Sequence, residues 1–291
     1  MIVPVMNEEF PALSYLEDAW LRFKENRVAY ATLWVLAFLA FFAVVGPLVS
    51  PYSYSEIHLN SKNMPPCAQH WFGSDELGRD LFTRVWWGAR ISLFIGVTAA
   101  SIDVAFGVVY GAIAAYIGGK IDEVMMRLAD ILYSIPYLLV VILLTVIRGS
   151  GIGTILIAMT LTGWINMARI IRAQILQLKQ NDYIAAARVI GASHTRILFR
   201  HLLPNAIGPI IATLTLTIPT AIFTEAFLSF LGLGVQAPAA SWGVMVSDAL
   251  SAMRYYPWRL FFPAAMITLT MLCFNLLGNA LRDALDPRLR R

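Results

Sequence analysis

The sequence has few charged residues, few cysteines and no phosphate-binding loop. Only 14% of its 291 residues are charged while 58% are hydrophobic, and the mean hydropathy is +0.67. This composition lies outside the range of soluble domains and predicts an integral membrane protein. Cys67 falls in a polar segment and Cys273 in an apolar run, so we expect neither a disulfide nor a cysteine-based metal site. No Gly-x-x-x-x-Gly-Lys-Ser/Thr segment occurs, so the chain is not expected to hydrolyse ATP itself.

The N-terminal region lacks the pattern of a cleavable signal peptide, because it is acidic and has no short apolar core followed by a cleavage site. Residues 10–27 instead alternate apolar and charged residues at near-helical spacing. The apolar members are Leu13, Leu16, Trp20, Leu21 and Phe23. Residues 1–27 are therefore predicted to form an amphipathic segment on the membrane surface.

Apolar runs of about the 20 residues needed to cross a bilayer predict an all-α polytopic protein with about six transmembrane helices. The predicted spans are residues 28–49, 91–116, 123–147, 152–171, 207–233 and 260–281, and the third is broken at Pro136. The chain then divides into an N-terminal segment (1–27), a first helix (28–49), an extracytoplasmic loop (50–88), a core of five helices (89–281) and a short tail (282–291). In the second span, Gly96, Gly107 and Gly111 are expected to allow close helix packing.

A polar and basic stretch, residues 181–205, interrupts the apolar runs. Asn181 or Asp182 can cap a short helix, and Tyr183, Ile184, Ala187 and Ile190 fall on one face of that helix. Gly191 is expected to end the first helix and Ser193 to cap a second one. Pro204 is expected to stop that pattern and to start the next run at its first turn. Periodicity alone is equally compatible with an ordinary amphipathic loop at the membrane surface.

Lysine and arginine are distributed unequally between the two sides that six spans create. One side holds Arg22, Lys24, Arg27, Lys120, Arg127, Arg169, Arg172, Lys179, Arg188, Arg196, Arg200, Arg282, Arg288, Arg290 and Arg291, and the other holds Lys62, Arg79, Arg84, Arg148 and Arg254. Because basic residues concentrate in cytoplasmic segments, both termini and residues 181–205 are predicted to be cytoplasmic.

Two acidic residues, Asp103 and Glu225, lie in or near apolar runs and are candidates for a role inside the membrane. Each can carry a proton, bind a cation or contact a peptide amine. The favoured interpretation is that each accepts hydrogen bonds from neighbouring helices or lies near the membrane interface.

Two other groups of residues are rejected as sites of chemistry. Ser193 with His194 or His201 is better explained by helix capping than by catalysis. The spacing of His58, Cys67, His70 and Asp75 matches no metal site, and Asp75, Glu76, Arg79 and Asp80 are expected to form a local charged network.

Four blocks of sequence resemble one family of transporters. Ala185-Ala186-Ala187, Gly191 and Leu203-Pro204 resemble the cytoplasmic coupling loop of ATP-binding-cassette (ABC) importer permeases, in the branch that imports peptides and nickel, although Ala185 replaces the usual Glu. The other blocks are residues 70–80 before the second span, where Ser74 replaces the usual Thr, residues 228–243, and residues 274–287, where Asn279 replaces the more usual Asp.

The resemblance implies a type I ABC importer permease fold and a role in peptide import, in the shorter of two related peptide permeases. It implies four kinds of partner: a second homologous permease, two ABC ATPase subunits, an extracytoplasmic solute-binding protein and membrane lipid. The ATPase subunits would bind ATP and Mg²⁺, and residues 50–88 and 234–257 would receive the solute-binding protein. It implies neither nucleic acid nor any cofactor or metal on this chain. The residues implied in ATPase coupling are Tyr183, Ala185, Ala186, Ala187, Arg188 and Gly191.

The resemblance places the protein in a bacterial-type cytoplasmic membrane. Two alternatives remain open at this point. The same machinery can import nickel or another small solute, or the chain can be an ion-gradient-driven carrier that uses Asp103 and Glu225.

Overall fold

The structure, a computed structural model, describes residues 15–236 and 238–285, whose regular structure is helical apart from one β-bridge between Ser74 and Asp80. Among these residues, five helices are long and apolar enough to cross a membrane, and there are six spans if one bent helix pair counts as a span. The long helices are α2 (Arg27–Val49), α3 (Leu81–Ile117), α6 (Ile152–Leu178), α9 (Ile207–Phe230) and α11 (Trp258–Ala284). The prediction of an all-α polytopic protein with about six spans is confirmed.

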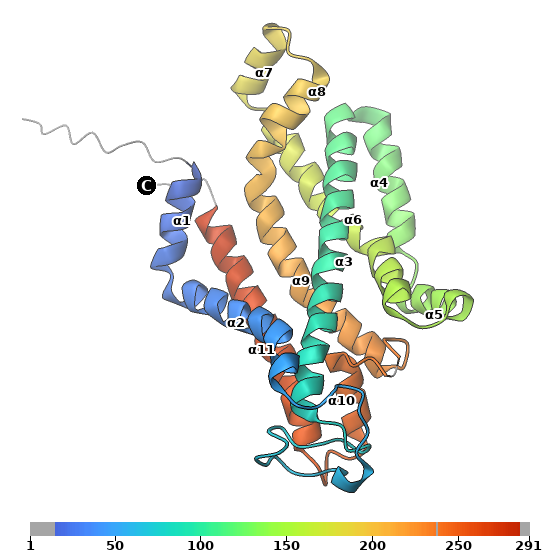
Figure 1. The fold of residues 1–291 in the computed structure, drawn as a ribbon. Coiled ribbons are helices and arrows are strands. Elements are labelled where there is room, and N and C mark those ends of the chain that lie inside the picture. Colours follow the sequence, from blue (N-terminus) through green and yellow to red (C-terminus); the bar gives the residue numbers. More distant parts are fainter. Residues whose placement is uncertain (1–14, 237, 286–291) are drawn as a thin grey trace, which may run out of the picture.

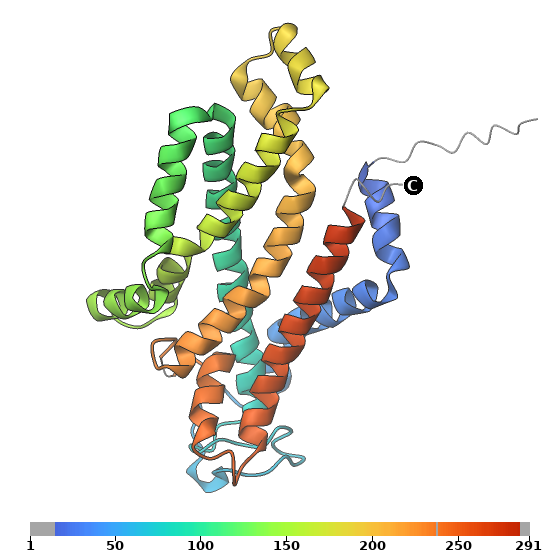
Figure 2. The same ribbon diagram turned by 180° about the vertical axis from the view of Figure 1, so that it is seen from behind.

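The long helices form a bundle in which α3 packs on α6 and α9, and α9 packs on α11 (Figure 1). Helix α2 lies obliquely on the outside, against α3 and α11. The shorter helices are α1 (Tyr15–Glu25), α4 (Gly119–Tyr133), α5 (Tyr137–Arg148), α7 (Asp182–Val189), α8 (His194–Arg196) and α10 (Trp242–Leu250). Both views place α7 and α8 at one end of the molecule and the loop before α3, with α10, at the other (Figure 2).

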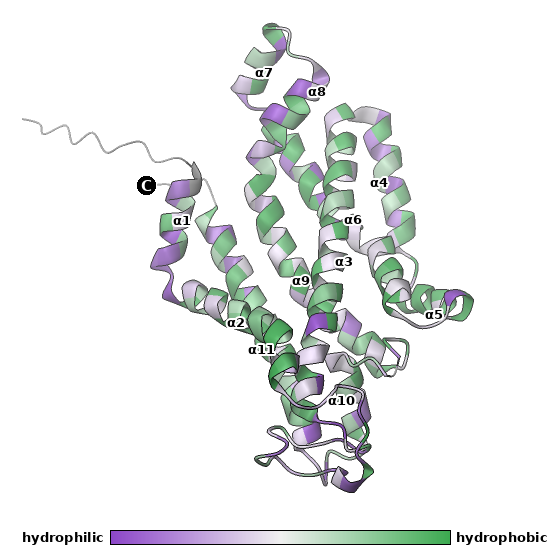
Figure 3. Ribbon diagram, in the orientation of Figure 1, coloured by the Kyte–Doolittle hydropathy of each residue, from purple (hydrophilic) through white to green (hydrophobic). Residues whose placement is uncertain are grey.

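Hydrophilic residues concentrate at these two ends and on α1 and α4, whereas the middle of the bundle is mostly hydrophobic (Figure 3). Phe23 of α1 is buried in a cluster with Leu277 and Ala280 of α11, while Trp20 is 47% exposed. The amphipathic segment predicted near the N-terminus is therefore helical from Tyr15 and packs partly on the bundle. Its first residues, including Leu13, and the tail residues Arg288, Arg290 and Arg291 lie outside the described residues.

The third predicted span consists of two helices, α4 and α5, that meet at an angle of 73°. Pro136 stands at the N-terminus of α5. Because proline has no backbone N–H, it cannot continue the hydrogen-bond ladder of α4. The predicted break at Pro136 is confirmed.

Helix α3 begins at Leu81, well before the predicted start of the second span at Ile91. The cause is Asp80, whose carboxylate accepts hydrogen bonds from the backbone N–H and the hydroxyl of Thr83 at 2.8 and 2.7 Å and so caps the helix. Further along α3, a Cβ on Gly107 would lie 2.5 Å from Cβ of Met167, and one on Gly111 would collide with the backbone of Ala168. The expected close packing at these glycines is confirmed, and it is directed at α6.

The second short helix predicted after Gly191 is not a separate element. Residues 194–230 form one continuous helical run, in which α8 passes through a π-helical segment, Ile197–Leu202, and a 3₁₀ turn, Pro204–Ala206, into α9. Pro204 has no N–H to donate to the preceding turn, and the N–H of Leu203 bonds to the carbonyl of Leu198, five residues back, at 2.9 Å. Pro204 thus stands in the first turn of the next segment, as predicted, but the helical run before it is widened and continues instead of stopping.

Residues 50–80 and α10 form a folded structure at the end opposite α7, which we call the outer cap. Two of its buried ion pairs join Asp75 to Arg79 at 2.6 Å and to Arg84 of α3 at 3.5 Å. Glu76 bonds instead to Arg259 of α11 at 3.1 Å, and Asp80 bonds to His70 at 2.9 Å. The charged network predicted at Asp75, Glu76, Arg79 and Asp80 is thus present but extends to α3 and α11.

Candidate functional site

Helix α7 and the turn after it form the exposed tip of the molecule. Ile184 is fully buried, and Ala187 packs against the same apolar cluster beneath the tip. Val189 and Ile190, in contrast, are 87% and 86% exposed. Of the residues predicted to fall on one face of α7, Ile190 lies just beyond the last helical residue, and both Ile190 and Tyr183 are exposed.

The turn at Gly191 has the left-handed conformation that favours glycine, with φ at +85°. The N–H of Ala192 bonds to the carbonyl of Ala187 at 3.0 Å, and that of Gly191 to the carbonyl of Arg188 at 3.0 Å, which satisfies carbonyl groups at the helix end. The predicted C-terminal glycine cap is confirmed. At the start of α7, Asn181 occupies the cap position but its side chain makes no capping hydrogen bond.

The predicted coupling residues surround this turn. Tyr183, Ala185, Ala186 and Arg188 are exposed, and Ala187 is half-buried. Ser193 caps the next helical turn through a hydrogen bond from the N–H of Arg196 at 3.3 Å. This confirms the capping role of Ser193, and His194 bonds elsewhere, so no nucleophile and base are paired here.

Two contacts that the sequence did not predict attach the tip to the bundle. The ammonium of Lys179, between α6 and α7, donates to the carbonyls of Ala115 and Tyr116 at the end of α3, both at 2.9 Å. The hydroxyl of Tyr116 bonds to Nδ1 of His194 at 2.7 Å. Burial, and then the nearby Arg188, lower the pKa of Lys179. The end of α3 thereby links the residues on both sides of α7.

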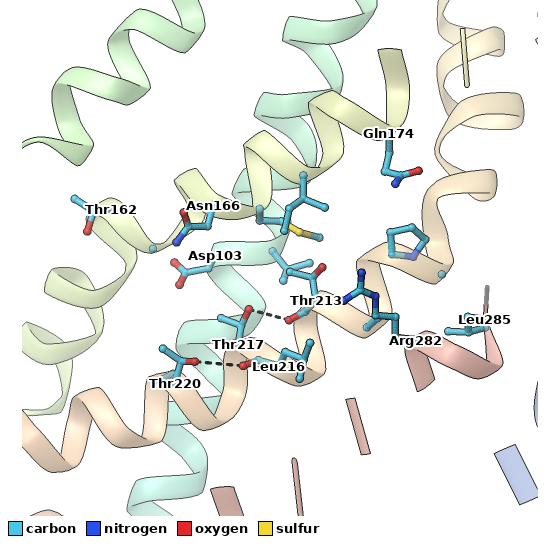
Figure 4. Close-up of a pocket in the computed structure, with 18 of the residues that line it drawn as sticks. Asp103, Thr162, Asn166, Gln174, Thr213, Leu216, Thr217, Thr220, Arg282 and Leu285 are labelled. Atoms are coloured by element: carbon cyan, nitrogen blue, oxygen red, sulfur yellow. Dashed lines mark hydrogen bonds between the residues drawn. The ribbon is translucent and has the colours of Figure 1, made fainter. Parts of the chain in front are cut away.

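A cavity of about 1090 Å³ lies between α3, α6, α9 and the end of α11 (Figure 4). Its polar lining residues come mainly from single faces of two helices. On these two helices they are Thr162, Asn166, Gln174 and Gln177 of α6 and Thr213, Thr217, Thr220 and Thr224 of α9. Polar residues at helical spacing within an apolar run were the available sequence signal for this lining.

The two acidic candidates have different surroundings. Glu225 is fully buried and accepts hydrogen bonds from Ser229 at 2.8 Å and Ser92 at 3.1 Å, as the favoured interpretation predicted. Asp103 is 6% exposed and makes no hydrogen bond with any described residue, and its Oδ1 is buried. For Asp103 the hydrogen bonds of the favoured interpretation are therefore absent among the described residues, and its alternative, a position near the membrane interface, stays a prediction.

No group of three or more His, Cys, Asp or Glu side chains among the described residues is arranged to hold a metal ion. His58, Cys67, His70 and Asp75 form no such group there. Cys67 and Cys273 are both free.

Comparison with known families gives two matches. The model of the family described as binding-protein-dependent transport system inner membrane component matches residues 107–291, which is more than half of the chain. The chain belongs to this family. The permease also matches, over residues 14–66, the family described as N-terminal TM domain of oligopeptide transport permease C.

Curated relatives match nearly the whole permease. The dipeptide transport system permease protein DppC of Bacillus subtilis is 58% identical over 97% of this chain and 88% of its own length. The oligopeptide transport system permease protein OppC of the same organism is 56% identical over 96% and 92%, and OppC of Escherichia coli K12 is 44% identical over 96% and 93%. The resemblance to peptide-type ABC permeases is confirmed.

A solved structure shares the fold. The inward-facing MetNI methionine ABC transporter superimposes with a TM-score of 0.59 at 17% sequence identity, over 70% of this chain and 96% of that chain. The likeness supports the predicted type I permease fold. The permease is thus a multi-pass membrane protein of an ABC transport system, and its relatives are permease subunits and not ATPases.

Proposed function

We propose that this permease and a second homologous permease together form the path for di- and oligopeptides through an ATP-driven importer. The observation that carries this proposal is the combination of an exposed coupling tip with a polar cavity directly connected to it. The cavity is lined from Asn181 and Asn205, beside the tip, to Thr224 deep in α9. Relatives named as dipeptide and oligopeptide permeases support the substrate class.

The tip is the surface that docks on an ABC ATPase subunit. Val189 and Ile190 present apolar side chains to solvent, a surface typical of a protein interface. Ala185 and Ala186 keep the exposed side of α7 small, so that a groove of the ATPase can approach the helix closely. ATP and Mg²⁺ are bound by two such partner subunits, because this sequence has no phosphate-binding loop.

Closure of the ATPases on ATP moves α7, and the bundle then changes between inward-open and outward-open arrangements as packed rigid bodies. Lys179 and the Tyr116–His194 pair carry this movement to the end of α3. Helix α3 also lines the cavity through Asp103 and Val104, so the same helix contacts the residues beside the tip and lines the path.

The basic residues near α7 and near both ends of the chain favour a cytoplasmic position for this side of the molecule. The outer cap and the loop 234–257 then face an extracytoplasmic solute-binding protein. The membrane is accordingly the cytoplasmic membrane of a bacterial-type cell.

Copurification from detergent-solubilised membranes tests this assembly. We expect the tagged permease to recover a second permease and ATP-hydrolysing subunits, and the complex in liposomes to take up trialanine when ATP and the binding protein are present. A single chain that moves solute without nucleotide would contradict the proposal and favour an ion-gradient-driven carrier. ATP-dependent uptake of Ni²⁺ but not of trialanine would assign the same machinery to nickel.

A further inference from the structure

Asp103 is a buried carboxylate that the coupling mechanism leaves unused. It lies in the middle of α3, its side chain makes no hydrogen bond or ion pair with any described residue, and Oδ1 is buried. A buried carboxylate without a partner is costly, and costlier still inside a membrane, so such a group indicates a ligand.

The carboxylate is held at the cavity wall by its packing against α6. A Cβ on Gly163 would collide with both carboxylate oxygens of Asp103. Only glycine at position 163 therefore leaves space for the Asp103 side chain. Figure 4 shows Asp103 on the wall together with Asn166 of α6 and Thr217 of α9. Tyr137 lines the same cavity, and its hydroxyl is likewise buried without a partner among the described residues.

The facing wall on α9 presents hydrogen-bond acceptors. The hydroxyls of Thr217, Thr220 and Thr224 donate to the carbonyls of Thr213, Leu216 and Thr220, at 2.8, 3.3 and 2.8 Å. Each hydroxyl has one hydrogen, so its lone pairs remain available to accept from the cavity. A wall of this kind favours a ligand rich in donors.

The charge of the ligand follows from the charged residues that line the cavity. Among the described lining residues these are Asp103 and Arg282, and Arg282 is an exposed side chain in the last turn of α11. A multivalent metal ion is disfavoured, because Asp103 is a single carboxylate outside any metal-binding group of described residues. A primary ammonium has one positive charge and three donors, and it matches one carboxylate surrounded by neutral acceptors.

We propose that Asp103 binds the ammonium group at the free amino terminus of a peptide as it passes through the cavity. Asn166, Thr217 and Tyr137 supply the neutral oxygen atoms around that site. The proposal rests on the proposed peptide-import function and adds to it a residue that recognises substrate inside the permease itself.

The test uses the complete transporter in liposomes, with ATP, the binding protein and radiolabelled trialanine. Asp103→Asn keeps the shape of the side chain and removes the charge, while Asp103→Glu keeps the charge and changes the shape. Asp283→Asn makes the same chemical change at an exposed position outside the cavity and serves as the control. ATPase activity of each complex reports whether the assembly is intact.

We expect Asp103→Asn to lower trialanine uptake about tenfold, since a charge-assisted hydrogen bond is lost, while Asp103→Glu retains more uptake than Asp103→Asn and Asp283→Asn matches the wild type. A structural role would give the opposite order, with Asn tolerated and Glu harmful, and would overturn the proposal. Wild-type uptake in Asp103→Asn would overturn it as well.

Two further outcomes bear on the proposed function itself. Uptake driven by a proton gradient without ATP, and lost in Asp103→Asn, would assign Asp103 to ion coupling and overturn both proposals. Absence of trialanine uptake by the wild-type complex, with ATPase activity intact, would overturn peptide import first and the ammonium site with it.

Discussion

The two ends of the permease are built on different principles. Where the outer cap meets α3, three charged side chains are buried and paired: Asp75, Arg79 and Arg84 are all less than 10% exposed and lie within 4 Å of a partner. At the coupling tip, apolar side chains are exposed, with Val189 and Ile190 almost entirely in solvent. The buried charges at this end are thus paired within the chain, whereas the tip has an apolar surface that another protein can cover.

Substitutions at the two ends should therefore have different consequences, for stability at the outer cap and for coupling at the tip. A buried ion pair is expensive to break, because the remaining charge stays desolvated. An exposed turn contributes little to the stability of the isolated chain, so changes there should affect transport more than folding.

Asp75→Asn should have the largest effect on stability. Asp75 accepts from Arg79 at 2.6 Å and lies 3.5 Å from Arg84, and both arginines would lose their charged partner. We expect the free energy of unfolding to fall by about 3–5 kcal/mol, the usual cost of breaking a buried pair. Thermal unfolding of the purified permease in detergent measures the change.

Glu56→Gln is the matched control, since Glu56 is 47% exposed and pairs with His58 in the same outer cap. It should lower the stability by less than about 1 kcal/mol. Equal losses in the two variants would show that burial of the ion pairs does not stabilise the outer cap.

At the coupling tip, Gly191→Val should impair transport and leave folding intact. Gly191 has φ at +85°, and Gly149, in the turn between α5 and α6, has φ at +81°. A Cβ added at either glycine would meet no described residue within 4 Å. Valine at either site therefore meets the same backbone penalty of about 1–2 kcal/mol, and its Cβ meets no steric clash. We expect both variants to remain in the membrane.

Only Gly191→Val should uncouple transport, because only that turn positions Val189 and Ile190. If the tip relieves this backbone penalty by changing its orientation, about 1–2 kcal/mol corresponds to a roughly tenfold loss of trialanine uptake. Uptake by Gly149→Val should stay near the wild type. Unchanged uptake in Gly191→Val would count against docking through this tip, as would an equal loss in both variants.

Tyr116→Phe should have a smaller effect. It removes the hydroxyl that bonds to His194 and leaves the ring in place. A hydrogen bond of this kind contributes about 0.5–1.5 kcal/mol, so uptake per ATP hydrolysed should fall a few-fold. Tyr255→Phe removes a hydroxyl from a 75% exposed residue at the outer end and should leave that ratio unchanged.

The sequence predicted those features that depend on one residue and its neighbours in the chain. Pro136 breaks a span because it has no N–H, Gly191 ends α7 because it adopts a positive φ, and Ser193 caps a turn through its own hydroxyl. The spans also follow from local composition, since α2 begins and ends within one residue of its predicted bounds.

Features that depend on distant residues were not predicted. The partners of Lys179 are carbonyls at the end of α3, and Asp103 has no partner among the described residues because of how α6 and α9 surround it. Pro204 was expected to end a helix, but the long-range packing of Leu202 and Ala206 in the cluster beneath the tip accompanies a widened and continuous helix. Tertiary contacts here override a local signal.

Lys179→Met should have the smallest effect on stability, although it removes two hydrogen bonds. The ammonium is partly buried and lies near Arg188, and its lowered pKa means that the charged form costs free energy in the folded protein. The gain from the carbonyl contacts and this cost oppose each other, so the free energy of unfolding at neutral pH should change by less than about 1 kcal/mol.

The same opposition predicts a pH dependence of definite sign. Between the lowered pKa of Lys179 and the ordinary lysine value of about 10.4, the unfolded chain binds more protons than the folded one. The stability contributed by this site therefore rises with pH through that alkaline window, and Lys179→Met lacks the rise. Thermal unfolding of both proteins across the window measures it, with Lys120→Met, on exposed α4, as a control for simple loss of a positive charge. If the wild type instead loses stability relative to Lys179→Met as the pH rises, the carbonyl contacts outweigh the burial.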